Sequence, residues 1–257
     1  MSLIPAKVHT RLVASVKKFQ PILNSAKSKD VNESDTVVII TDVLSELFGY
    51  DKYSEITSEF AIKKTFCDLA IKIDGKPRLL IEAKAIGFDL KDDHIRQAVN
   101  YGANSGVDWV ILTNGYQWKV YKITFGKPVD KELVYEFDLL NINVKKQSDL
   151  ELLYYVSKEA IGKSILEDFH LQKQALSKFF IGQILLTDSV LESVRRVLRK
   201  VSPDVKITNE GIKEVLVTEV FKREILEGEK AEEAKKKITK CLKTLAKKAV
   251  VKDQSQD

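Results

Sequence analysis

Three charged side chains, those of Asp68, Glu82 and Lys84, fall within one short and otherwise apolar stretch of the sequence. Two β-rich runs on either side of Asp74 and Gly75 predict a hairpin, because an Asp-Gly pair tolerates the positive φ values of a tight turn. Side chains alternate across a strand, so Glu82 and Lys84 share a face. In one register of the hairpin, Asp68 on the neighbouring strand points toward that pair.

This charged group has two interpretations. In the first, Glu82 and Lys84 lie on the solvent side of a strand, where a charged pair contributes only tenths of a kcal/mol. In the second, the strand is covered on both faces, since residues 79–86 are nearly all apolar and Leu80 and Ile86 share the face of the charges. Buried charges are costly unless they are paired. A divalent cation would pair them, and Mg²⁺ prefers one or two carboxylates together with water and phosphate oxygens.

Whole-chain composition narrows the function classes. The 257 residues suffice for one sizeable domain, with or without a smaller companion. A net charge of +5 suits a polyanionic partner. Cys67 and Cys241 lie far apart and the chain has three histidines, which argues against a zinc site of Cys and His. No apolar run approaches the ~20 residues that cross a bilayer, and no signal peptide begins the chain, so we expect a cytoplasmic protein without membrane contact.

Helical periodicity opens the chain and predicts an N-terminal helix within residues 1–30. Asn32 or Ser34 can cap a second helix, which Gly49 ends. Glu33 falls in the first turn of that helix, where an acidic residue usually complements the helix dipole.

Strands and a further helix are expected around the hairpin. The predicted elements are a strand over 53–60, a helix over 89–105 that carries Gln97 and Tyr101 on one face, a second hairpin turning at Asn114-Gly115, and a strand over 134–140. Acidic residues at the start of the 89–105 helix are interpreted as a complement to its dipole.

The character of the sequence changes after about residue 141, where helical periodicity takes over. We therefore predict a domain over residues 31–140, a boundary near 141–148, an all-helical domain over 149–251 and a disordered tail over 252–257. The last helix is expected to bury Ala234, Ile238, Cys241, Leu242 and Leu245 beneath a lysine-rich coat.

Residues 161–164 read Ile-Gly-Lys-Ser but do not form a phosphate-binding loop. That loop needs a glycine five positions before Gly162, and Ser157 stands there. No nucleotide-driven motor is predicted.

The order of these motifs resembles the PD-(D/E)XK nuclease superfamily. It is most similar to the N-terminal nuclease domain of type I restriction enzyme R subunits and to standalone predicted type IV restriction endonucleases. The resemblance covers about residues 31–140. It rests on motifs that occur in the family's order, namely Glu33, Asp68, the Glu82-Ala83-Lys84 triplet, Gln97 with Tyr101, and Thr113-Asn114-Gly115. Cys67 stands where the superfamily's name has proline, which is commonly absent.

The resemblance implies an α/β fold, a restriction-endonuclease-like mixed β-sheet flanked by helices, followed here by an all-helical C-terminal domain. It implies a Mg²⁺ site, with Mn²⁺ as a substitute metal, formed by Asp68, Glu82 and the carbonyl of Ala83. Glu33 would join the metal directly or through water, and Lys84 would orient or deprotonate the attacking water. Gln97 would position the helix, the lysine or the DNA backbone.

The function implied is hydrolysis of DNA phosphodiester bonds by an endonuclease of restriction or defence. Two alternatives remain open: a DNA-binding module that keeps the nuclease fold without cleaving, and a repair or junction-resolving nuclease. A weaker third is a non-catalytic interaction protein. DNA is the expected partner, and the resemblance leaves a homodimer open.

Overall fold

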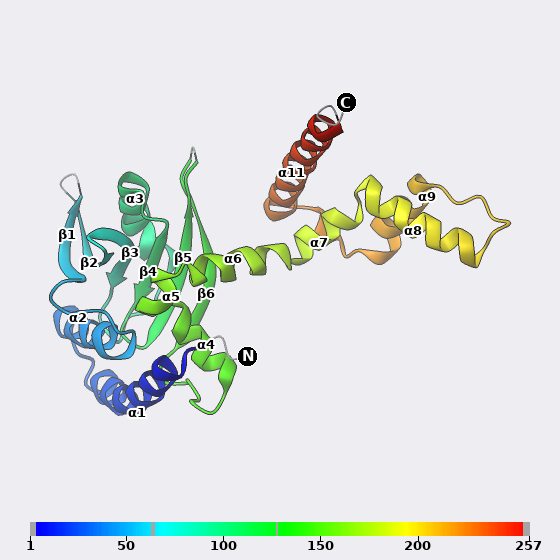
Figure 1. The fold of residues 1–257 in the computed structure, drawn as a ribbon. Helices are drawn as coiled ribbons and strands as arrows, with labels where there is room; N and C mark the ends of the chain where they lie inside the picture. Colours follow the sequence, from blue (N-terminus) through cyan, green and yellow to red (C-terminus); the bar gives the residue numbers. More distant parts are fainter. Residues whose placement is uncertain (1–3, 63–64, 127, 254–257) are drawn as a thin grey trace. The chain divides into compact units, whose positions relative to one another are not determined.

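The computed structural model describes residues 4–62, 65–126 and 128–253 (Figure 1). The chain divides into two compact units, Met1–Phe169 and His170–Asp257. The first contains a β-sheet and its flanking helices, and the second is helical throughout its described residues.

The helices of the first unit are α1 (Ala6–Ser28), α2 (Glu33–Asp42), the π-helical turn η1 (Val43–Leu47), the 3-10 turn η2 (Asp92–Ile95), α3 (Arg96–Ser105), α4 (Gln147–Tyr155) and α5 (Lys158–Gly162). Its strands are β1 (Ile56–Ile62), β2 (Thr65–Ile73), β3 (Lys76–Ala83), β4 (Trp109–Thr113), β5 (Gln117–Thr124) and β6 (Asp130–Asp138). Helix α6 (Ile165–Ala175) continues across the division. The second unit has α7 (Lys178–Leu185), α8 (Asp188–Val201), α9 (Asn209–Val215), the π-helical turn η3 (Leu216–Val220), α10 (Arg223–Leu226) and α11 (Glu229–Asp253).

The six strands form one sheet in the order of the chain, β1 to β6. Neighbouring strands run antiparallel except β3 and β4, which are parallel and are joined through α3. A parallel pair requires such a crossover because its two strands begin at the same edge of the sheet. In the parallel pair, Glu82 lies opposite Leu112 and Ala83 opposite Thr113. The predicted fold class, a mixed sheet with flanking helices followed by a helical region, is confirmed.

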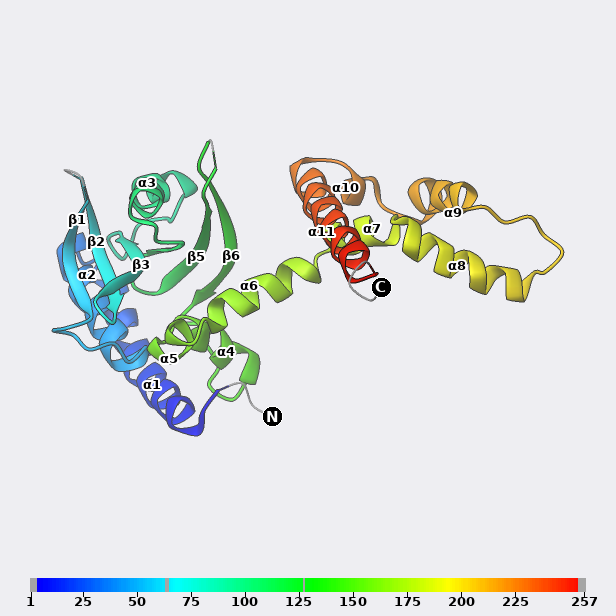
Figure 2. The same cartoon turned by 45° about the horizontal axis from the view of Figure 1, so that its top comes forward.

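Helices cover both faces of the sheet. One face packs with α1, α2, η1, α4 and α5 around a large core that includes Ile81, Ile111 and Trp118. The other face packs with α3 in a smaller core that includes Leu80 and Val110 (Figures 1 and 2). The central strand β3 is therefore buried on both sides, which explains its nearly continuous run of apolar residues.

Turn residues fix the two predicted hairpins. Asp74 and Gly75 have φ values of 52° and 73°, so both central positions of the β2–β3 turn are left-handed, as a type I′ turn requires. Gly115 has a φ of 90° between β4 and β5. A side chain there would also meet Leu23 and Thr36, because a Cβ on Gly115 would lie 3.5 Å from each.

The side chain of Asn32 caps α2 by accepting from the N–H of Asp35. Helix α2 continues directly into the wider π-helical turn η1.

Arg11 ties three segments of the first unit together. From α1, its side chain donates to the carbonyl oxygens of Leu47 and Phe48 at the end of η1. Its guanidinium also makes a bidentate ion pair with Glu159, both N···O distances being 2.7 Å. Arg11 therefore links α1, η1 and α5.

The division between the units falls later than the expected boundary at 141–148. Helices α4 and α5 bury Leu150, Leu153 and Ala160 in the larger core, and Leu166 of α6 joins them. The predicted N-terminal helix likewise belongs to this core rather than standing apart. The predicted boundary follows the change from strand to helical periodicity in the sequence. Which segments form one unit depends instead on which of them bury apolar side chains in the same core.

The second unit buries few apolar side chains. Among its described residues these are Leu191, Ala231 and Ala234. Helix α11 packs beside α7 and α10 (Figure 2). The expectation for the last helix is correct for Ala234 but wrong for Cys241, which is exposed, and for Leu242, which is 43% exposed. Ile238 is half-buried, and the side chain of Leu245 lies outside those that the structure describes. Helix α11 continues to Asp253, so the predicted tail is helical at 252–253 and otherwise lies outside the described residues. No helix in the described ranges is long and apolar enough to span a membrane.

Candidate active site

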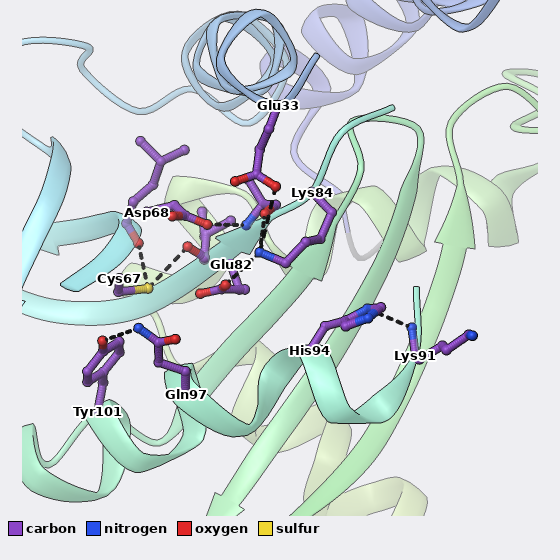
Figure 3. A network of polar contacts seen from close by, with 12 residues as sticks. Glu33, Cys67, Asp68, Glu82, Lys84, Lys91, His94, Gln97 and Tyr101 are labelled. Atoms are coloured by element: carbon purple, nitrogen blue, oxygen red, sulfur yellow. Dashed lines mark hydrogen bonds and ion pairs between the residues drawn. The ribbon is translucent and has the colours of Figure 1, made fainter. Parts of the chain in front are cut away.

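Strands β2 and β3 separate where the candidate residues begin. Their backbone pairing reaches Leu69 opposite Ile81. Beyond that point two side chains of β2 supply the bonds: Asp68 Oδ2 accepts from the N–H of Ala83 at 2.7 Å, and the thiol of Cys67 donates to the carbonyl of Ile81 at 3.1 Å (Figure 3). The carboxylate of Asp68 is thereby held against the end of β3.

The ammonium of Lys84 lies at the carbonyl side of the same residue, Ala83. Its Nζ donates to Glu82 Oε1 and to the carbonyl oxygen of Ala83, each at 2.8 Å. Asp68 thus binds the N–H of Ala83 while Lys84 binds its C=O. The three charged side chains singled out in the sequence converge at the end of β3 (Figure 3).

The Glu82–Lys84 ion pair is largely shielded from solvent. The side chain of Glu82 is 9% exposed and that of Lys84 is 19% exposed. Burial raises the pKa of Glu82, the hydrogen bond from Lys84 opposes that rise, and the charges of Asp68 and Glu33 add to it. For Lys84, burial acts to lower the pKa, but the bond to Glu82 and the charges of Glu82, Glu33 and Asp68 outweigh it, so the pKa is raised. Lys84 is therefore an ammonium at neutral pH.

Glu33 approaches the group from α2. Its Oε2 lies 3.9 Å from Lys84 Nζ, and its side chain is 52% exposed. Figure 3 shows the carboxylate pointing from α2 toward Lys84. Because Glu33 is also the first residue of α2, this position serves both the helix dipole and the charged group.

Three hydrogen bonds fix the chain segment after β3. The N–H of Lys84 donates to the carbonyl of Thr113 at 2.9 Å. Two residues later, the N–H of Ile86 donates to the hydroxyl of Thr36 at 3.1 Å. Asn114, which is fully buried, then donates to the carbonyl of Phe88 at 3.0 Å. The Thr113-Asn114-Gly115 turn therefore holds the backbone that carries Lys84.

Gln97 and Tyr101 lie one turn apart on α3, and the amide of Gln97 donates to the hydroxyl of Tyr101 (Figure 3). Tyr101 is 2% exposed and belongs to the smaller core. The preceding turn η2 is held by Asp92, which accepts from the hydroxyl of Tyr121 at 3.0 Å.

Two expectations about β3 need correction. The solvent-face interpretation of Glu82 is wrong, because the residue is 7% exposed between two packed layers. Ile86 does not share the face of the charges, since it packs in the larger core while Leu80 packs in the smaller one. Regular alternation ends with β3 at Ala83, so counting residues further along the chain assigns the wrong side.

Two residues of the site carried no signal on their own. Thr36 is a buried polar side chain in the middle of α2, and only its position three residues after Glu33 sets it apart. Cys67 stands at the position where the superfamily's name has proline, and nothing else in the sequence sets it apart. Its thiol lies in the seam between β2 and β3, where burial raises its pKa to about 12, so it is a neutral donor.

The oxygen atoms at the end of β3 suit a hard divalent cation. Carboxylates of Asp68 and Glu82 and the carbonyl of Ala83 are the oxygen donors that Mg²⁺ prefers. A positive group, the Lys84 ammonium, already lies against two of them. In the described parts of the chain, this site included, no three His, Cys, Asp or Glu side chains gather as a metal site. The candidate set has two carboxylates and a carbonyl.

Comparison with known proteins bears on one segment of the chain. No curated protein and no solved structure matches the chain. A family model does match one segment. That segment contains Asp68, Glu82, Lys84 and Gln97 but begins after Glu33. Residues 39–135 are similar to the N terminus of the type I restriction enzyme R protein, which confirms for this segment the resemblance predicted from the sequence.

Proposed function

We propose that this chain is a Mg²⁺-dependent DNA endonuclease that acts in restriction or defence against foreign DNA. The observation that carries the proposal is the convergence of Asp68, Glu82 and Lys84 at the end of β3, where Asp68 and Lys84 bind the backbone of Ala83 and Glu82 binds Lys84. These residues lie within the segment similar to the restriction enzyme R protein.

Asp68, Glu82 and the carbonyl of Ala83 would hold the metal. A bound Mg²⁺ supplies a Lewis acid that polarises a phosphoryl oxygen and lowers the pKa of water. The carboxylates do not attack the phosphorus; they hold the cation. Asp68 is restrained for this task by its bond to the N–H of Ala83.

Lys84 carries a proton at Nζ and brings a positive charge to the phosphate. Its raised pKa favours orienting water or stabilising the negative charge that develops on phosphate oxygens over acting as a free base. The bonds from Thr113, Thr36 and Asn114 hold the backbone on which this lysine stands, so its range of positions is set by its own side chain.

The second unit offers a separate surface for the DNA backbone. Helix α11 presents exposed lysines, including Lys235, Lys236, Lys240 and Lys243. Phosphate contact is the commonest functional use of such a row. We assign to it binding without base recognition, because lysines that touch phosphates carry no sequence information.

Plasmid cleavage tests the proposal directly. Wild-type protein should nick or linearise plasmid DNA with Mg²⁺ or Mn²⁺ and not with EDTA, on modified or unmodified DNA. The double variant Asp68→Ala, Glu82→Ala should lose cleavage while keeping its circular dichroism spectrum. Glu136→Ala, which removes an exposed carboxylate of β6, is the matched control and should cleave as wild type does. Undiminished metal-dependent cleavage by the double variant would show that the site is misassigned.

The alternatives give different results in the same assays. A DNA-binding module without cleavage would bind DNA but show no heat of Mg²⁺ binding that depends on Asp68 and Glu82. A repair or junction-resolving nuclease would cut branched DNA in preference to plain duplex across a panel of duplex, branched, methylated and single-stranded substrates.

A further inference from the structure

The Lys84 ammonium lies on two of the three groups proposed to hold the metal. Its Nζ is 2.8 Å from Glu82 Oε1 and 2.8 Å from the carbonyl oxygen of Ala83. Both side chains of the pair are largely buried. The cation position at the end of β3 is therefore already filled, by one positive charge that belongs to the protein itself.

An ammonium and a divalent ion compete for these two oxygens. Mg²⁺ binds oxygen at about 2.0–2.1 Å, and an N⁺–H···O bond spans about 2.7–2.9 Å. With both cations on the same oxygens, their centres would be a few ångströms apart in a site shielded from water, where like charges repel strongly. The ammonium therefore opposes metal binding at Glu82 and Ala83, and its departure favours that binding.

Glu33 is placed to receive the displaced ammonium. Its Oε2 is 3.9 Å from Lys84 Nζ, just beyond hydrogen-bond distance, on the side of α2 (Figure 3). The lysine stem is long and flexible, so rotation of its side chain can exchange one carboxylate for the other. Thr36, one turn after Glu33, bonds to the backbone of Ile86 and holds α2 at this spacing.

We propose that Lys84 is a displaceable counter-ion, and that Glu33 acts as the acceptor for its ammonium when the metal binds. This inference rests on the proposed metal site. It gives Glu33 a positioning role through Lys84 in place of a role as a metal ligand. It also couples two events, because the lysine leaves Glu82 and Ala83 only when the cation arrives.

Calorimetric titration of the full chain with Mg²⁺ alone, without DNA, tests the displacement. Lys84→Met removes the competing charge and should tighten Mg²⁺ binding by at least about tenfold, equivalent to ~1.4 kcal/mol. Lys76→Met, which removes an exposed lysine of the β2–β3 turn, should leave the affinity unchanged. Lys84→Gln keeps a neutral donor to Glu82 and should tighten binding by a smaller factor. It replaces Lys84→Met if thermal melting shows that variant to be unfolded.

A double-mutant cycle tests the role of Glu33. Glu33→Gln alone should weaken Mg²⁺ binding, because the displaced ammonium loses its acceptor. In the Lys84→Met background the same change should leave the affinity nearly unchanged. Equal weakening in both backgrounds would make Glu33 a metal ligand and overturn its assignment as the acceptor.

The failure of this inference can be told from the failure of the proposed function. If neither wild type nor Lys84→Met binds Mg²⁺, the metal site itself is wrong, and the displacement falls with it. If both bind with the same affinity, the site stands and only the displacement is refuted.

Discussion

Thr36 of α2 accepts a hydrogen bond at 3.1 Å from the backbone N–H of Ile86, 50 residues further along the chain. The same hydroxyl donates to the carbonyl of Asn32 at 2.7 Å. Thr36 is fully buried, so no water can replace either bond. This one side chain therefore ties the start of α2, with Glu33, to the segment that follows Lys84.

Thr36→Val keeps the shape of the side chain and removes both bonds. A buried N–H without a partner costs ~1–3 kcal/mol, so we expect that loss of stability in urea unfolding together with weaker cleavage. Thr36→Ser should restore most of both. Thr41→Val is the matched control, because the hydroxyl of Thr41 donates to the carbonyl of Val37 within its own helix. A Thr36→Val protein as stable and active as wild type would contradict this role.

Asp68→Asn and Asp68→Ala should separate the two tasks of Asp68. Asparagine still offers an oxygen to the N–H of Ala83 and should leave the urea midpoint close to that of wild type. Alanine leaves that N–H without its partner and should lower stability by ~1–3 kcal/mol. Both variants lack the negative charge, so both should lose Mg²⁺ binding in calorimetry and plasmid cleavage. Retained Mg²⁺ affinity in Asp68→Asn would count against Asp68 as a ligand.

Glu159→Gln should lower stability at neutral pH but not in acid. Burial acts to raise the pKa of Glu159, but the hydrogen bond and charge of Arg11 outweigh it, so the pKa is lowered. A lowered carboxyl pKa contributes stability above the unfolded value, about 4.3. That stability is lost as pH falls through the folded value. The difference between wild type and variant, about 1–2 kcal/mol at pH 7 because the pair is partly exposed, should shrink below about pH 4.3.

The control for this pH dependence is Glu46→Gln, which removes a carboxylate paired with Lys18 where both side chains are about half exposed. An exposed ion pair contributes little, so its removal should change stability only slightly at any pH. Urea unfolding across pH 3–8 measures both variants. A Glu159→Gln deficit that persisted in acid would mean that the charge of Glu159 is not the stabilising feature.

Lys236→Gln with Lys240→Gln should reduce the salt dependence of DNA binding. Each phosphate neutralised contributes about 0.9 to the slope of log affinity against log salt concentration, so the double variant should lower that slope by up to about 1.8. Lys76→Gln with Lys145→Gln, two exposed lysines of the first unit, is the control and should leave the slope unchanged. Fluorescence anisotropy over a salt series gives the slope, and an equal effect of the two pairs would rule out a special role for α11.

Much of the first unit could be predicted from local signals. The Asp74-Gly75 and Asn114-Gly115 turns set the hairpins, and strand alternation placed Glu82 correctly within β3. The sequence also indicated Asn32 as a cap of α2. These features depend on residues close in sequence, which is why their chemistry can be read there.

What could not be predicted depends on where segments distant in sequence meet. The separation of β2 from β3 decides the roles of Asp68 and Cys67, and the packing of α2 decides the role of Thr36. In the second unit, the exposure of apolar side chains could not be predicted for a related reason. Val201 is 75% exposed, although it belongs to the apolar stripe of α8. Such a stripe predicts a helix face that can be buried, and the described residues of this unit leave that face uncovered.

The layering of the first unit limits how small a working fragment can be. The segment similar to the restriction enzyme R protein begins at residue 39 and ends at residue 135, yet α1, α4 and α5, which cover the Ile81 and Ile111 face, lie outside it. A fragment trimmed to that segment would lack Glu33 and expose the apolar face, inviting aggregation. A transplantable cassette, for fusion to another DNA-binding protein, therefore needs the chain from about residue 4 to residue 169.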